Sequence, residues 1–299
     1  MKKKQKLCLF DILGCLIFGI IVLICVYPFY YIFIYSISDP SEVVKGIFLF
    51  PAGLSFSNYK DVFEIAGLFS AFGVSVLRTV LGTALTVFSC ALYAYLVTKK
   101  ELPFRKFFYR LAVITMYLNA GLIPVYLTLK TYGLRNSFLV YILPAMLSAY
   151  YIILIKTFME QLPPALEESA RIDGAGHFAV FFKIILPLSK PILATIAVFA
   201  AVGQWNSWFD NYLYCTDETL KTLQYLLYNV LNDAQNKANA MAMASANTVS
   251  AMQQASTNQI SAEGVRMTIT MIATLPILCI YPFMQKYFVK GITLGAVKG

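Results

Sequence analysis

The stretch Glu168-Ser169-Ala170-Arg171-Ile172-Asp173-Gly174, followed by Ile184-Ile185-Leu186-Pro187, is a polar, helix-breaking island between two long apolar segments. Just before it, Pro163-Pro164 can open a helix, because proline fits the first helical turn. Asp173-Gly174 can end that helix, because glycine accepts a positive φ. We therefore predict a helix over residues 165–172, followed by a tight turn.

A second short helix is predicted after this turn. Its apolar residues recur at the i, i+3, i+4, i+7 spacing of one helical face: Phe178, Phe181, Phe182 and Ile185. We expect this face to pack on the apolar segments and Pro187 to end the helix. Three charged residues of the first helix should face the cytoplasm: Glu167, Glu168 and Arg171. On its charges alone, the island could also be a solvated loop with a chance turn.

Outside this island the chain is strongly apolar. Of its 299 residues, 59% are hydrophobic and 13% charged, and the mean hydropathy is +0.68, whereas soluble domains carry roughly a quarter charged residues. A membrane-spanning helix needs roughly 20 apolar residues. Six segments qualify, and they run from about 11 to 36, 69 to 97, 107 to 129, 138 to 158, 188 to 208 and 267 to 287. We expect an all-α, polytopic membrane protein with six transmembrane helices, whose internal prolines bend the helices rather than end them.

Positive charge indicates the orientation of these segments. Lysine and arginine gather at both chain ends and in the second-to-third and fourth-to-fifth loops, which is the pattern of cytoplasmic loops. Both termini are therefore expected in the cytoplasm. The net charge of +9 comes without the aromatic-interleaved motifs of nucleic-acid binding, so no nucleic-acid partner is expected. The apolar run from Phe10 to about Tyr35 is too long for the roughly 7–15-residue core of a cleaved signal peptide, and we expect it to remain as an anchor.

The spacing of the island resembles a motif of the importer permeases of ATP-binding cassette (ABC) transporters. Their cytoplasmic loop reads Glu-Ala-Ala, three residues, Gly, nine residues, Ile, one residue, Leu-Pro. The matching residues here are Glu168-Ser169-Ala170, Gly174, Ile184 and Leu186-Pro187, with Ser169 as the one departure. The string Leu166–Ala175 and the tail Gln285–Gly299 are similar to the carbohydrate-uptake branch, in particular to the second membrane subunit of the maltose permease and its multiple-sugar relatives. The resemblance covers roughly residues 69–299.

This resemblance implies the type I ABC importer (MetI-like) permease fold and a domain plan. Residues 1–68 would hold the N-terminal transmembrane helix and the first extracytoplasmic loop, residues 69–287 the permease domain, and residues 288–299 a cytoplasmic tail. Within the permease domain, residues 160–187 would form the cytoplasmic coupling loop, and residues 209–266 an extracytoplasmic loop. Part of that loop, 217–264, would contact a solute-binding protein.

The resemblance also implies which residues meet the ATPase. In the family, the coupling loop sits in a cleft on the ATPase subunit and transmits its closure, and Glu168 aligns with the acidic residue that pairs there with a basic group. The residues expected to couple are Glu167, Glu168, Ser169, Ala170, Arg171, Asp173, Gly174, Leu186 and Pro187. In the maltose relative the tail reaches between the two ATPase subunits. This implies contacts from Lys290, Gly291, Gly295, Lys298 and Gly299, with a frayed terminus as the alternative.

The chain itself lacks the residues of a catalytic site. It has no phosphate-binding Gly-x-x-x-x-Gly-Lys-Ser/Thr loop. Its one histidine, His177, has no Cys or carboxylate ligands at metal spacing. We therefore expect a transport subunit that is not an enzyme and binds no metal or cofactor, with ATP and Mg²⁺ held by partner ATPase subunits.

Polar and aromatic residues at membrane depth are candidates for the sugar path. Aromatic faces and amides commonly hold sugars, and polar groups within membrane segments usually face a cavity. The candidates are Asn119, Gln204, Trp205, Asn206, Trp208 and Tyr212. For the aromatic residues, the alternative is an interfacial belt.

Together these features predict one of two membrane subunits of an ATP-driven, binding-protein-dependent importer for a carbohydrate, an oligosaccharide, in a bacterial cell membrane. The expected partners are a second permease subunit, two ATPase subunits, an extracytoplasmic solute-binding protein, the sugar and the lipid bilayer. An ion-coupled transporter would need intramembrane acids and inverted repeats, and a membrane enzyme a catalytic cluster; the sequence shows neither. An importer for an amino acid, a peptide or a metal is the alternative within the family.

Overall fold

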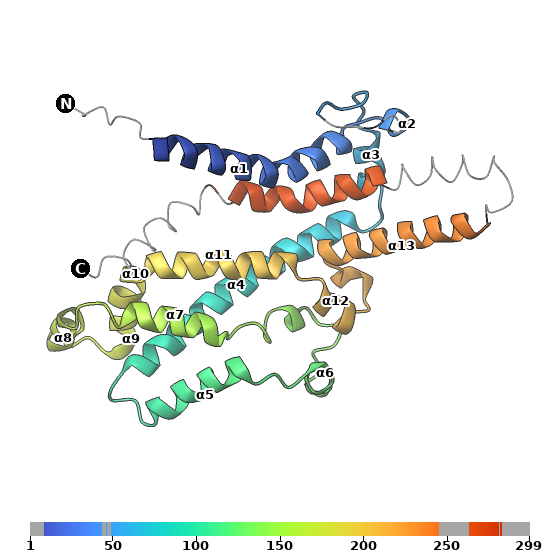
Figure 1. Cartoon of the computed structure of the whole chain (residues 1–299). Helices are drawn as coiled ribbons and strands as arrows, with labels where there is room; N and C mark the ends of the chain where they lie inside the picture. Colours follow the sequence, from blue (N-terminus) through green and yellow to red (C-terminus); the bar gives the residue numbers. More distant parts are fainter. Residues whose placement is uncertain (1–8, 44–45, 47–48, 245–262, 281, 283–299) are drawn as a thin grey trace. The chain divides into compact units, whose positions relative to one another are not determined.

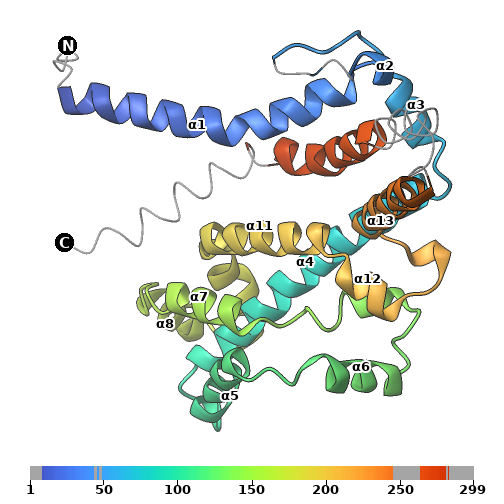
Figure 2. The same ribbon diagram turned by 45° about the vertical axis from the view of Figure 1, so that its right-hand side comes forward.

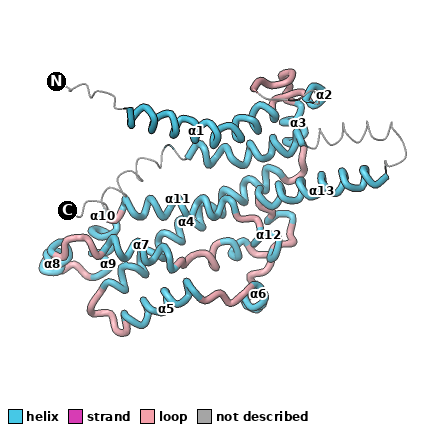
Figure 3. The backbone as a smooth tube through the Cα atoms, in the orientation of Figure 1, coloured by secondary structure: helices cyan, strands magenta, loops and turns pink. Residues whose placement is uncertain are grey.

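The computed structural model describes residues 9–43, 46, 49–244, 263–280 and 282. The described regular elements are all helices, and the tube in Figure 3 shows helices joined by loops, with no strand among these residues. The chain divides into two compact units, residues 1–66 with 229–275 and residues 67–228 with 276–299. The tail residues Lys290 to Gly299 lie outside the described residues, as does the 245–262 part of the predicted binding-protein loop.

The first unit is built on α1 (Leu9–Ser36), followed by α2 (Pro40–Val43) and α3 (Ser57–Phe63). An unbroken apolar run makes α1 long enough to span a membrane, which confirms the first predicted segment. Ile34 and Tyr35 at its end are buried, and Met267 packs against them. Met267 belongs to the helix Glu263–Ile280, drawn in red beside α1 in Figures 1 and 2. This helix is the sixth predicted segment; it begins earlier than expected, and its predicted end lies beyond the described residues.

The second unit is arranged around α4 (Leu68–Thr98), which packs along α11 (Lys190–Asn206) and α7 (Ala149–Met159). The buried face of α4 is rich in small residues, which allow helix backbones to approach closely within a membrane protein. These small buried residues are Ala71, Ser75, Gly82, Thr86, Cys90, Ala91 and Ala94. The second and fifth predicted segments are therefore confirmed as helices.

The third and fourth predicted segments are not continuous helices, and that prediction is wrong. The third is divided into α5 (Arg105–Tyr117) and α6 (Leu122–Thr131). At the break, the Asn119 side chain accepts a hydrogen bond from the Gly121 N–H (2.9 Å), and Gly121 has a φ of 84°. An Asn side chain that bonds to its own backbone competes with helical hydrogen bonding, which explains the break.

The fourth segment divides into η1 (Phe138–Tyr141), a turn containing Pro144, and α7. Proline lacks the N–H that a continuing helix needs. Among the described residues, three helices are long and apolar enough to cross a membrane. The helices His177–Leu188 and Lys190–Asn206 meet at a bend of 79°, and counting this bent pair as one span gives up to four spans among the described residues.

The connection between α7 and α11 consists of short helices. They are α8 (Ala165–Ile172), α9 (His177–Val180), a π-helical turn η2 (Phe181–Ile185) and α10 (Leu186–Leu188). After α11 come α12 (Phe209–Tyr214), η3 (Glu218–Leu220) and α13 (Leu223–Ala244). The described part of the predicted 209–266 loop is thus largely helical.

Candidate functional site

The 160–187 loop has the local structure that its sequence predicts. α8 begins directly after Pro164 and ends at Ile172, the predicted bounds. Gly174 has a φ of 83°, and the Ala175 N–H donates to the Ala170 carbonyl (2.9 Å). This is a glycine-terminated helix end, in which the turn satisfies carbonyls that the helix leaves free.

Two ion pairs connect α8 to the end of α4 and the turn after it. The Lys99 ammonium pairs with the Glu167 carboxylate and lies over the Tyr95 ring, 4.1 Å from its centroid. Arg171 Nη1 donates to Glu101 Oε1 (2.6 Å). Glu167 and Arg171 were expected to face water, but both bind to the protein body, because the α4–α5 turn brings opposite charges beneath α8.

The second ion pair stays charged at physiological pH. The hydrogen bond from Arg171, with lesser help from its positive charge, lowers the pKa of Glu101 to about 2. The same bond raises the pKa of Arg171 above its usual value. Because this pKa lies below the ordinary carboxyl value, the pair forms fully above pH 4.5 and is lost only as the pH falls toward 2.

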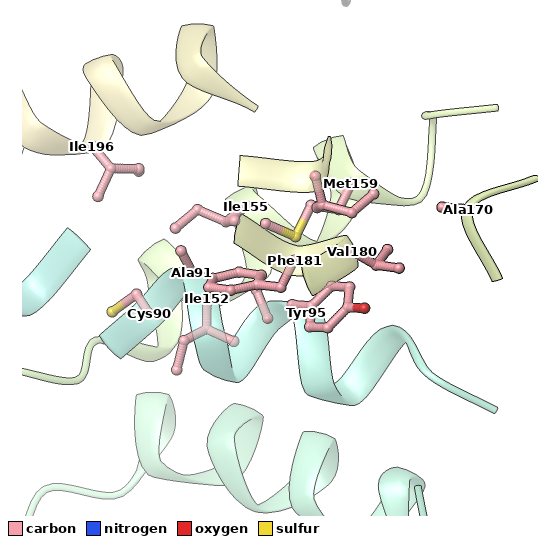
Figure 4. Packing of buried hydrophobic residues seen from close by; sticks show 12 residues of the cluster. Cys90, Ala91, Tyr95, Ile152, Ile155, Met159, Ala170, Val180, Phe181 and Ile196 are labelled. Atoms are coloured by element: carbon pink, nitrogen blue, oxygen red, sulfur yellow. The ribbon is translucent and has the colours of Figure 1, made fainter. Parts of the chain in front are cut away.

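A buried core holds the second half of the loop against the membrane helices (Figure 4). Phe181 contacts Tyr95 of α4, with ring centroids 5.0 Å apart, and the Tyr95 hydroxyl donates to the His177 carbonyl (3.2 Å). The other buried members of this core are Cys90, Ala91, Ala94, Ile152, Ile155, Met159, Ala170, Val180, Ile185 and Ile196. The loop is therefore packed against α4, α7 and α11 and is not a solvated loop with a chance turn.

Only half of the predicted apolar face is buried. Phe181 and Ile185 are in the core, whereas Phe178 is 69% exposed and Phe182 48% exposed. The π-helical turn over Phe181–Ile185 is wider than an α-helical turn and rotates the residues after it relative to those before it. Pro187 also lies inside a helix rather than ending one, since the chain bends after Leu188.

The outer surface of α8 combines one free acid with apolar side chains. The Glu168 side chain is exposed, and its carboxylate makes no hydrogen bond or ion pair with any other described residue. Ile172 is 86% exposed, and Leu166 and Phe178 are also exposed. Ser169, Asp173 and Gly174 lie on the same exposed loop. A well-packed element that exposes apolar groups around an unpaired carboxylate has the features of a protein-docking surface.

A buried polar cluster lies at the first half of α4, away from the C-terminal end to which α8 is attached. The Arg78 side chain is 2% exposed, and its Nη1 and Nη2 donate to the two Asp210 carboxylate oxygens (3.1 and 2.5 Å). Arg78 also donates to Gln204 Oε1, and its guanidinium lies 4.5 Å from the Tyr141 ring centroid. Sequence reasoning assigned no role to Arg78 or Asp210. The signal was available, since a lone arginine within an apolar segment must find a partner.

This cluster borders a pocket of about 270 Å³. Its polar and aromatic lining includes Arg78, Tyr141, Tyr151, Gln204, Asp210 and Tyr214. Of the six residues predicted for the sugar path, the pocket's lining includes only Gln204. Asn119 and Asn206 are exposed elsewhere.

The predicted aromatic path residues lie in two other places. Trp205 is buried against Phe72, with ring centroids 6.0 Å apart, and lines a separate apolar pocket. Trp208 stacks on Tyr228 at 4.2 Å and lies next to Tyr212. The described residues contain no group of three His, Cys, Asp or Glu side chains that could hold a metal ion.

Comparison with known proteins places these features in a family. The family model described as "Binding-protein-dependent transport system inner membrane component" matches residues 87–294. Protein LplC of Bacillus subtilis (strain 168) is 37% identical over 291 residues, covering 97% of this chain and 95% of LplC. The polygalacturonan/rhamnogalacturonan transport system permease protein YtcP of the same organism is 36% identical over 295 residues, covering 97% and 99%.

A solved structure is similar over almost the whole chain. It is the crystal structure of a bacterial ABC transporter involved in the import of the acidic polysaccharide alginate. The TM-score is 0.80 at 30% sequence identity, with 93% of this chain and 96% of that chain covered.

Proposed function

The chain belongs to the family of binding-protein-dependent transport system inner membrane components, and from this premise we propose that it carries a carbohydrate, an oligosaccharide, across the cytoplasmic membrane. It is a permease subunit of an ABC importer and not an enzyme. Carbohydrate cargo is supported by the names of its relatives, which include YtcP and the melibiose/raffinose/stachyose import permease protein MelC of Bacillus subtilis. Cargo of another class is correspondingly disfavoured.

The proposed partners are supported by the family, whose description names a binding-protein-dependent transport system. The complete importer would contain a second permease subunit, two ATPase subunits that hold ATP and Mg²⁺, and an extracytoplasmic binding protein that delivers the sugar. Both termini of this chain would lie in the cytoplasm, in accord with the distribution of lysine and arginine. The tail from Lys290 to Gly299 would contact the ATPase pair.

The proposed coupling role rests on a single observation: α8 is attached to α4 on one side and exposed on the other. One side of the loop is attached to α4 through Lys99–Glu167, Arg171–Glu101 and the buried core. The other side exposes Glu168 and apolar residues. When the ATPase subunits close on ATP, a basic group of the ATPase would hold Glu168 in a charge-assisted hydrogen bond. The movement would then pass through α8 to α4 and tilt the membrane helices between inward- and outward-facing states.

Reversing the charge of Glu168 tests this proposal. In the assembled importer, Glu168→Lys should lower sugar uptake at least tenfold, because a charge-assisted hydrogen bond contributes about 1.5–3 kcal/mol. Membrane insertion should be unchanged, since the exposed Glu168 carboxylate makes no ion pair or hydrogen bond with another described residue. Glu64→Lys is the matched control, because Glu64 is also an exposed acid whose side chain makes no ion pair with another described residue. Normal uptake in Glu168→Lys, with the ATPase still bound, would contradict the role of α8.

A further inference from the structure

Arg78 lies in the wall of the 270 Å³ pocket, yet its charge is fully used by the protein. Its five N–H groups all donate: Nε–H to Gln204, the Nη1 pair to Asp210 and to the Ser207 carbonyl, and the Nη2 pair to Asp210 and Gln204. One face of the guanidinium lies against the Tyr141 ring. Arg78 therefore offers an incoming anion neither an unmatched charge nor a free N–H group.

Asp210 is the other charged group in the described lining of this pocket. One carboxylate oxygen also accepts from the Ser207 hydroxyl (3.0 Å) and from the Asn211 N–H (2.9 Å). The pair therefore makes an electrically neutral wall in which both charges are matched. A negatively charged ligand would approach Asp210 without a free cation to bind it, and burying such an unpaired charge is costly.

The remaining wall is suited to an uncharged sugar. The rings of Tyr151 and Tyr214 line the pocket, and their hydroxyls make no hydrogen bond with the described residues. The Gln204 amide donates one N–H to the Tyr141 carbonyl (3.3 Å), which leaves its second N–H available. The volume is near the lower end of the roughly 300–1,000 Å³ range of ligand pockets, which suits one ring at a time rather than a whole oligosaccharide.

From the matched charges and the free hydroxyls, we infer that this pocket is a subsite for a single uncharged, hydroxyl-bearing sugar ring. Tyr151 and Tyr214 are its ligand-binding residues. Arg78 and Asp210 are positioning residues that hold Gln204 and keep the pocket neutral. The inference rests on the proposed carbohydrate transport and adds a selectivity: the subsite rejects a uronate ring.

Binding to the complete purified importer in lipid nanodiscs tests this selectivity, without the binding protein and with or without a non-hydrolysable ATP analogue. Saturation-transfer NMR would compare galactotriose with trigalacturonate, which differ in the carboxylate at C6. Galactotriose should bind at least about tenfold more tightly, the consequence of an unpaired charge in the pocket. Equal binding of the acidic trimer, or no binding of either sugar in either nucleotide state, would overturn the subsite.

Hydroxyl deletions identify the site of binding. Tyr151→Phe and Tyr214→Phe should each weaken galactotriose binding about three- to tenfold, the usual effect of losing one neutral hydrogen bond. Tyr126→Phe is the control, because Tyr126 stacks on Tyr214 but does not line the pocket. Unchanged binding in both pocket variants would place the sugar elsewhere. Uptake of radiolabelled oligosaccharides by the same importer with its binding protein tests the proposed function separately, since import can persist when the subsite fails.

Discussion

Reversing the charge of either Lys99 or Glu167 should weaken the connection between α8 and α4, and reversing both charges together should restore it. The two side chains are 12% and 21% exposed, so the pair is only partly screened by water. The Lys99 ammonium also contacts the Tyr95 ring, which adds a cation–π interaction. In Lys99→Glu, two carboxylates face each other; in Glu167→Lys, two ammonium groups do.

The expected magnitude follows from this geometry. A hydrogen bond between charged groups contributes about 1.5–3 kcal/mol, so each single variant should weaken the attachment of α8 by about 2 kcal/mol, roughly 30-fold in the ratio of attached to detached helix. The buried core around Phe181 is untouched, so the protein should still insert and assemble. The expected defect is in coupling: ATP is hydrolysed, but less sugar is imported for each ATP.

The assay is the number of sugar molecules imported per ATP hydrolysed in proteoliposomes that contain the complete importer. Each single variant should lower this ratio severalfold, and the double variant Lys99→Glu/Glu167→Lys should regain most of it. Lys156→Glu/Glu160→Lys is the matched control, because that pair (2.7 Å) lies at the end of α7 and does not involve α8, and Lys156 also lies over a tyrosine ring. If the single variants keep the wild-type ratio, α8 does not transmit force through Lys99, and the reasoning is refuted.

Two further predictions concern glycines, each with a second glycine as its control. Gly174→Val should impair coupling, because the φ of 83° costs a β-branched residue about 1–2 kcal/mol or more, even though no atom lies near the added Cβ. Gly176→Ala, at an ordinary φ and in open space, should have no effect on the import-to-ATP ratio, and equal defects would show that φ is irrelevant. Gly82→Ala should lower thermal stability and sugar binding, since its Cβ would lie 2.8 Å from the Gln204 amide nitrogen and displace that amide from the buried cluster. Gly73→Ala on the same helix meets no atom and should leave the melting temperature unchanged or slightly raised; equal loss in both would point to a general effect on α4.

The loop around Glu168 shows why local structure can be predicted so well from sequence. Pro164 fixes the backbone at the start of α8, and Gly174 permits the positive φ that ends it; both effects act within a few residues. The ends of α8 were therefore predicted correctly, as was the turn that follows. The long apolar runs of α1 and α4 were equally readable, because membrane insertion depends on the length of an apolar stretch.

The breaks in the third and fourth segments needed more than hydropathy. Asn119 bonds to the Gly121 N–H, and the turn at Pro144 separates η1 from α7, although both lie within apolar stretches. Asparagine and proline are compatible with either a bent or a broken helix, and packing against neighbouring helices selects between them. The π-helical turn at Phe181–Ile185 is also a result of packing that hydropathy does not reveal. For this reason Phe178 and Phe182 were wrongly expected to be buried.

The sequence by itself determined that this chain is a helical membrane protein with a polar loop of fixed local shape, because those properties depend on composition and on neighbours in the chain. Tertiary structure alone decided what Arg78, Glu167 and Arg171 bind. Their partners Asp210, Lys99 and Glu101 lie far away in sequence, and a charge reaches its partner only after helices have packed. For the same reason, Gln204 lines the polar pocket while its neighbour Trp205 lines an apolar one: adjacent residues on a helix point in different directions, and only packing shows what each direction meets.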